Sequence, residues 1–109
     1  MGFRVAKVTI NEANLKNNHI YLNEILSIFP KDTIGGNNLS SKGKEIEISY
    51  FFTNVKKTFM TDIAGDKKIL RKRGKLSGTG MLLSDLGIKA GDVLEFKKIT
   101  EYSFEVSVL

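Results

Sequence analysis

The stretch EIEISYF at Glu45–Phe51 indicates the fold class, because polar and apolar residues alternate along it. Successive side chains of an extended chain point to opposite faces, so Ile46, Ile48 and Tyr50 share one face. The polar residues between them share the other. This alternation is typical of a half-buried antiparallel strand, with one face on a core and one in water.

Outward from this strand, stretches rich in β-branched and aromatic residues recur in both directions and predict further strands. They are FRVAKVTI at 3–10, KTFMTDI at 57–63, KKILRKR at 67–73, VLEFKKI at 93–99 and SFEVSVL at 103–109. The chain is therefore expected to hold six or seven strands in a mainly β, barrel-like domain.

Two short helices are expected between these strands. The apolar residues of Tyr21–Phe29 recur at helical spacing, and Pro30 ends the pattern. A second helix is predicted over Met81–Leu86, with Gly87 as its C-terminal stop. The polar stretch Asn11–His19 is predicted to be a loop or arm.

Composition limits the chemistry open to the chain. Its 109 residues fit a single domain spanning 1–109. The absence of cysteine excludes a disulfide framework, a thiolate nucleophile and a Cys-based zinc site. A single histidine, His19, excludes sites that need two imidazoles from one chain. No apolar run is long enough to span a membrane or to act as a signal peptide, so we expect a cytoplasmic protein.

The positive charge is concentrated in one segment. The chain has a net charge of +5, yet Lys56–Lys75 alone holds eight basic and two acidic residues. That segment carries +6, and the rest of the chain sums to −1. Such clustering is the electrostatic pattern of a polyanion binder, because Lys and Arg at phosphates release condensed counterions. A solvated basic hairpin is the alternative.

Within this segment the run Arg71-Lys72-Arg73 is the sharpest feature. On a strand, Arg71 and Arg73 would point to one face, where two guanidinium groups could line a groove wall. A solvated strand face is the alternative. Asp62 is a candidate acceptor for a cytosine amino group. It could equally serve to orient a neighbouring Lys or Arg.

A cluster of asparagines precedes the first predicted helix, at Asn11, Asn14, Asn17 and Asn18. Their amides could pair with adenine in the major groove. Ordinary Asx turn chemistry is the alternative for each of them. His19 could donate to a phosphate or base edge, or could pack beneath the arm.

A metal-dependent nuclease is the catalytic alternative. Such a centre would use Asp85, Glu95 and Lys97, with the carboxylates holding the ion. Glu-x-Lys is a common pattern, however, and a strand already explains the alternation in VLEFK. No phosphate-binding GxxxxGK[ST] loop occurs. We therefore expect no catalytic residue, no metal site and no cofactor.

Five of the seven phenylalanines, Phe29, Phe51, Phe59, Phe96 and Phe104, follow strand or helix periodicity and are assigned to the core. Single-strand binders need exposed aromatic side chains on which bases stack. The assignment therefore favours double-stranded over single-stranded nucleic acid as the partner.

Three blocks of the sequence carry a resemblance to a known family. HIYLNEILSIFPKDTIGG at 19–36, TDIAGDKKILRKRG at 61–74 and LGIKAGDVLEF at 86–96 resemble B3-like DNA-recognition domains of restriction endonucleases. The last two blocks also resemble plant B3 transcription-factor domains. The resemblance extends from Phe3 to Val106 and implies an open seven-stranded pseudobarrel with two short helices. One departure is that Leu76 and a Gly-rich stretch stand where relatives often carry a bulky aromatic.

The resemblance also implies where DNA would be contacted, since two arms of that family grip the duplex in its major groove. The N-arm maps onto Thr9, Asn11, Asn14, Lys16, Asn17, Asn18 and His19. The C-arm maps onto Thr61, Asp62, Asp66, Lys67 and Lys68. Phosphate contacts map onto Lys31, Arg71, Arg73 and Lys75.

Together these observations predict a sequence-specific double-stranded DNA-binding domain, the target-recognition module of a bacterial restriction endonuclease. The catalytic nuclease would be a separate domain or subunit, and the isolated domain is expected to be monomeric. Three alternatives remain open at this point. They are a stand-alone DNA-binding regulator of the same fold, the nuclease described above, and a binder of RNA or acidic protein.

Overall fold

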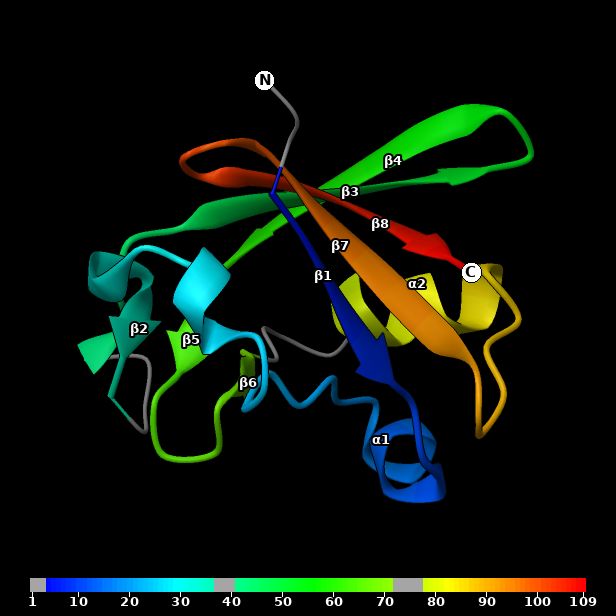
Figure 1. The fold of residues 1–109 in the computed structure, drawn as a ribbon, viewed down its shortest axis with the longest axis horizontal. Helices are drawn as coiled ribbons and strands as arrows, with labels where there is room; N and C mark the ends of the chain where they lie inside the picture. Colours follow the sequence, from blue (N-terminus) through cyan, green and yellow to red (C-terminus); the bar gives the residue numbers. More distant parts are fainter. Residues whose placement is uncertain (1–3, 37–40, 72–77) are drawn as a thin grey trace.

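A computed structural model describes residues 4–36, 41–71 and 78–109, which form eight strands in two sheets, two α-helices and two 3₁₀ turns. The larger sheet has the order β1-β7-β8-β3-β4, and the smaller one the order β2-β5-β6. Figure 1 shows that they form an open, not a closed, barrel. The predicted mainly β, open pseudobarrel with two short helices is confirmed. The strands are β1 Arg4–Thr9, β2 Ile34–Gly35, β3 Ile46–Phe52, β4 Val55–Thr61, β5 Ile63–Ala64, β6 Ile69–Leu70, β7 Val93–Thr100 and β8 Ser103–Val108.

The five-stranded sheet has the alternation that the sequence predicted. Ile46 and Ile48 of β3 are fully buried, and they lie opposite Thr61 and Phe59 of β4. All its strand pairs are antiparallel except β3 with β8, which is parallel. The number of strands exceeds the prediction because the smaller sheet consists of three strands of only two residues each.

The core lies on the inner face of the five-stranded sheet. Phe29 packs there with its ring centroid 4.6 Å from that of Phe104 and 6.1 Å from that of Phe96, and all three side chains are buried. Phe59 is half-buried. The assignment of Phe51 to the core is wrong, since this side chain is 52% exposed. The same alternation that buries Tyr50 turns its neighbour to the outer face.

The segment Asn11–His19 contains an α-helix, not the predicted loop. Helix α1 spans Glu12–Asn17. It starts with a capping box in which the side chains of Asn11 and Asn14 each accept the other's backbone N–H. Asn18 ends the helix in the left-handed region, with φ at 54°. The asparagines that indicated a turn are therefore the residues that cap the helix at both ends.

The predicted helix at Tyr21–Phe29 is also wrong. Tyr21 forms a β-bridge with Ile69, and the backbone N–H of Leu22 donates to the carbonyl of Lys68 at 2.7 Å. Only a 3₁₀ turn, Leu26–Ile28, follows. Pairing with β6 keeps the first part of the segment extended, although its apolar spacing also suits a helix. A second 3₁₀ turn covers Lys31–Thr33.

The second predicted helix is present as α2, Gly78–Asp85, which starts before the predicted residue and stops before Gly87 with φ at +61°. Of the basic strand predicted over 67–73, the described residues contain β6, and the residues beyond Arg71 lie outside the described part of the chain. No helix within residues 4–36, 41–71 and 78–109 is long and apolar enough to cross a membrane.

Candidate nucleic-acid interface

Helix α1 and the turn between β5 and β6 lie at the same end of the molecule, at the bottom of Figure 1. Two contacts connect the chain that leaves α1 with the end of this turn and with the strand that follows it. They are the bridge between Tyr21 and Ile69 and the hydrogen bond from Leu22 to Lys68. The two segments predicted as separate arms are therefore joined at their bases by main-chain pairing.

The predicted N-arm residues are mostly on the surface. Thr9 ends β1, and this residue is exposed together with Asn11, Lys16, Asn17 and Asn18. His19 is half-buried, with its ring edge-to-face against Tyr21 at 6.1 Å between centroids. Asn14 is the exception, at 2% exposed. Its Oδ1 accepts the backbone N–H of Asn11, so the side chain of Asn14 faces the protein rather than solvent.

A pocket of about 350 Å³ opens beside α1. It lies between the end of β1, the start of α1 and the chain that follows the helix. Its lining comprises Val8, Thr9, Asn11, Asn14, Tyr21, Asn23 and Glu24. The amide Nδ2 of Asn14 is buried and has no hydrogen-bond acceptor among the described residues. The pocket therefore combines amide, hydroxyl and carboxylate groups with one aromatic ring.

The predicted C-arm residues divide into two groups. Asp66, Lys67 and Lys68 form the exposed turn, where Lys68 has a φ of +56°. Thr61 and Asp62 are buried, at 1% and 0% exposed. The first three are open to a ligand in this conformation, whereas the side chain of Asp62, predicted as a base acceptor, lies inside the protein.

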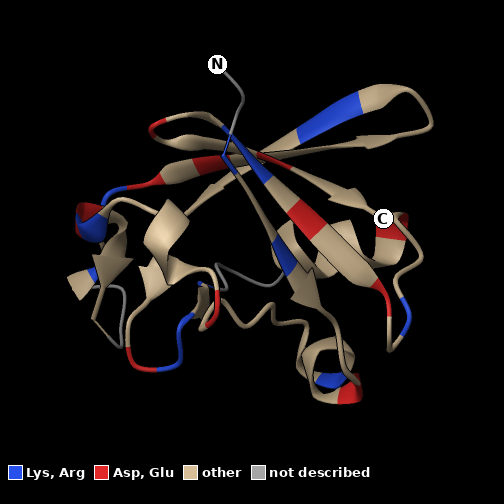
Figure 2. Cartoon of the chain, in the orientation of Figure 1, with Lys and Arg blue, Asp and Glu red and all other residues tan. Residues whose placement is uncertain are grey.

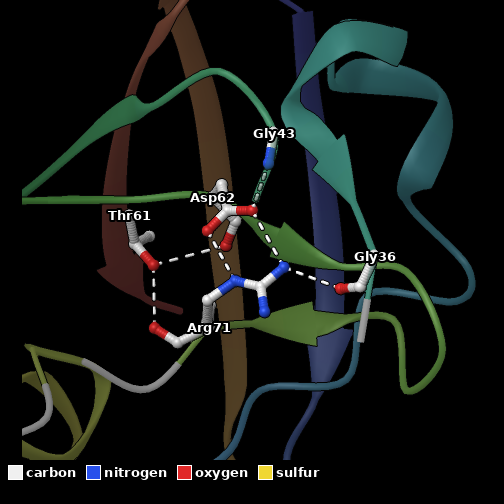
Figure 3. A network of polar contacts seen from close by, with 5 residues as sticks. All are labelled: Gly36, Gly43, Thr61, Asp62 and Arg71. Atoms are coloured by element: carbon white, nitrogen blue, oxygen red, sulfur yellow. Dashed lines mark hydrogen bonds and ion pairs between the residues drawn. The ribbon is translucent and has the colours of Figure 1, made fainter. Parts of the chain in front are cut away.

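Asp62 and Arg71 form a buried ion pair at the base of the β5–β6 hairpin (Figure 3). The guanidinium Nε donates to Oδ1 of Asp62 at 2.8 Å, and Nη2 donates to Oδ2 at 3.1 Å. Arg71 is only 8% exposed. The charge of Arg71, predicted as a phosphate contact, is therefore already paired inside the protein. The alternative that Asp62 orients a neighbouring cation agrees with this geometry.

The same ion pair connects three segments of the chain, as Figure 3 shows. Nη2 of Arg71 donates to the carbonyl of Gly36 at 2.7 Å, and the N–H of Gly43 donates to Asp62 Oδ2 at 2.7 Å. The hydroxyl of Thr61 donates to the carbonyl of Arg71 at 2.8 Å. A two-residue strand pair is too short to be stable alone, so this network holds the hairpin in place.

The remaining phosphate candidates are less informative. Lys31 is exposed at the start of the second 3₁₀ turn. Arg73 and Lys75 lie outside the described residues. Figure 2 shows both basic and acidic residues on α1 and on the β5–β6 turn. In the described part, the cations at this end of the molecule are thus interspersed with carboxylates.

The residues of the nuclease alternative lie on different elements. Asp85, at the end of α2, accepts hydrogen bonds from Tyr50 at 2.7 Å and from Lys57 at 2.9 Å. The Lys57 contact is the main cause that lowers the pKa of Asp85, while burial and Asp85 raise the pKa of Tyr50. Glu95 and Lys97 lie on β7, opposite Lys7 of β1 and Glu105 of β8 respectively. Within the described ranges, no three acidic, His or Cys side chains are grouped so as to hold a metal ion.

Comparison with known proteins gives a likeness at the level of structure. No protein-family model matches the sequence, and no curated protein matches it. Among solved structures, the N-terminal domain of Helicobacter pylori LlaJI.R1 is similar, with a TM-score of 0.62 and 15% sequence identity. The match covers 97% of this chain and 87% of that one. At this level of identity the likeness shows a shared fold.

Proposed function

We propose that this chain is a sequence-specific double-stranded DNA-binding domain, and that it serves as the target-recognition domain of a bacterial restriction endonuclease. The observation that carries the proposal is the joining of α1 and the β5–β6 turn at one end of an open pseudobarrel. Two short projections with exposed amides and lysines suit a duplex groove, where amides read base edges and lysines neutralise phosphates.

Within this proposal, exposed residues would contact DNA and buried ones would support them. Asn11, Asn17 and Asn18 are the exposed amides available for base edges, and Lys16, Lys67 and Lys68 are the exposed cations. Asp66 stands beside these lysines on the turn. Asp62 and Arg71 act indirectly, by holding the hairpin that carries the turn. We infer no catalytic role for this chain, so that cleavage would be the task of another domain or subunit.

The test is duplex binding measured by fluorescence anisotropy over a range of salt concentrations. A duplex selected from a randomised pool serves as the specific ligand, and a random duplex as the non-specific one. Reversing charge at Lys67 and Lys68 should weaken both complexes and reduce the salt slope by about one unit for each phosphate that is no longer neutralised. Asn17→Ala should weaken only the selected duplex, by about 1–3 kcal/mol if Asn17 makes a bidentate bond to a base.

Lys56 is the matched control. It is an exposed lysine on β4, in the hairpin at the opposite end of the molecule from α1 in Figure 1. Lys56→Glu changes the net charge by the same amount per residue but should leave the salt slope intact. Equal loss of binding from Lys56→Glu and from either turn variant would show that overall charge, not this surface, attracts DNA. No preference for any sequence in the selection would refute sequence-specific recognition.

A further inference from the structure

The pocket beside α1 has the size of a small-molecule site rather than of a surface dimple. Its volume of about 350 Å³ falls within the range of about 300–1,000 Å³ typical of ligand pockets. Val8 and Tyr21 supply apolar wall, and the other lining residues are polar. A flat, partly aromatic molecule with polar edges would fit such a lining.

Asn14, one of the residues that line the pocket, carries a hydrogen-bond donor that no described residue accepts from. Asn14 is 2% exposed, and its Oδ1 accepts the N–H of Asn11 at 2.8 Å. Its Nδ2 has no acceptor among the described residues. A buried donor without an acceptor reduces stability, so such groups are rare unless a ligand satisfies them. This donor therefore favours a ligand that brings a carbonyl oxygen or ring nitrogen.

Glu24 also lines the pocket, and its ionised carboxylate can only accept hydrogen bonds. It therefore requires a hydrogen-bond donor on the ligand. A complementary ligand would carry an N–H or amino group as well as a carbonyl oxygen or ring nitrogen. Every nucleobase carries both kinds of group. Guanine and cytosine have an amino group and a carbonyl, adenine has an amino group and ring nitrogens, and thymine has a ring N–H and carbonyls. Tyr21 could stack on any of these rings.

Lysines stand on three separate segments that adjoin the pocket. Lys16 lies in the last turn of α1, and Lys68 is bonded through its carbonyl to Leu22. The turn that carries Lys89 is held beside β1 by a 2.7 Å hydrogen bond from Gly91 to Ile10. All three lysines are exposed. They could neutralise the phosphates on either side of a nucleotide whose base enters the pocket.

We propose that this pocket receives one unpaired base, turned out of a duplex that lies against α1 and the β5–β6 turn. The proposal rests on the proposed function, because it needs duplex DNA at this surface. It extends that function from reading paired base edges to holding a single base outside the stack. Extrusion costs stacking and pairing energy, and the cost is smallest where the base is already unpaired.

The experiment compares random-sequence duplexes that are fully paired with duplexes that contain one unpaired nucleotide, at fixed salt and by fluorescence anisotropy. A duplex with one unpaired nucleotide should bind about tenfold more tightly than the paired duplex, because the extrusion cost is already met. The measured quantity is the ratio of the affinity for the unpaired duplex to that for the paired duplex.

Three variants test whether the pocket causes this difference in affinity. Asn14→Asp keeps the oxygen that accepts the Asn11 N–H but removes the unused donor. Glu24→Gln alters an exposed residue, so it tests the pocket even if Asn14→Asp proves unstable. Both should bring the ratio close to one. Asn54→Asp is the matched control, since it makes the same chemical change at an exposed position of the turn between β3 and β4, outside the pocket, and should leave the ratio unchanged.

The results separate the base pocket from the proposed DNA-binding function. A ratio near one for the native chain, or a ratio that survives in Glu24→Gln and in folded Asn14→Asp, would overturn the base pocket. If paired duplexes still bound with a normal salt slope, the proposed function would stand without it. If no duplex bound at all, the proposed function itself would be refuted, and the base pocket with it.

Discussion

Removing either partner of the Asp62–Arg71 ion pair should destabilise the domain more than removing both. Asp62 is 0% exposed and Arg71 8%, so each charge depends on the other for solvation. Removing one partner of a buried pair costs about 3–5 kcal/mol, because the remaining charge is left uncompensated. A domain of this kind has a total stability of only about 5–15 kcal/mol.

The hydrogen bonds of each partner indicate what a single variant would leave behind. In Arg71→Met, the Asp62 carboxylate would keep the N–H of Gly43 but lose both guanidinium bonds. In Asp62→Leu, the guanidinium would keep the carbonyl of Gly36 but lose the carboxylate. The double variant leaves two backbone groups without these side-chain partners, at about 0.5–1.5 kcal/mol each. Its loss of stability should therefore be smaller than that of either single variant.

Urea unfolding followed by circular dichroism measures all three variants and completes a double-mutant cycle. Lys57→Met is the control, since it breaks the more exposed ion pair with Asp85, in which the side chains are 35% and 20% exposed. It should cost much less than Arg71→Met. A loss below about 1 kcal/mol for both single variants would contradict the reasoning, as would a double variant whose loss equals the sum of the two.

Other parts of the structure can be tested in the same way. Phe29→Ala should cost about 3–5 kcal/mol in chemical unfolding, because it removes a buried aromatic, and a loss near zero would contradict its place in the core. Asn11→Ala should cost about 1 kcal/mol and increase amide hydrogen exchange in α1, since the capping box is removed; unchanged exchange would mean that tertiary contacts alone hold the helix. The hydrogen bond to Asp32 raises the pKa of Tyr102 from 10.0 to about 12. Because this pKa is raised on folding, the stabilisation is fully present below pH 10.0 and is lost as the pH rises towards about 12. Ultraviolet titration of the phenolates should show that Asp32→Asn lowers this pKa, and no change would argue against the hydrogen bond.

The strands of the five-stranded sheet, though not their order, could be predicted from local sequence. Alternation along Glu45–Phe51 requires one face to be buried, and this period of two is a local property of an extended chain. The same alternation implies that Phe51, the residue after Tyr50, is exposed. Gly87 likewise marked the end of α2, because a left-handed φ favours glycine locally.

The features that depend on a distant partner could not be predicted in this way. The spacing of Tyr21–Phe29 suits a helix, but backbone pairing with β6, nearly fifty residues further along the chain, keeps its first residues extended. The polarity of Asn11–His19 was compatible with a loop or a capped helix, and reciprocal side-chain bonds selected the helix. Asp62 and Arg71 were recognised as charged, but charge type does not say whether a residue meets solvent, DNA or another residue. Only the closing of the β5–β6 hairpin brings them together, because their attraction requires positions that the fold alone supplies.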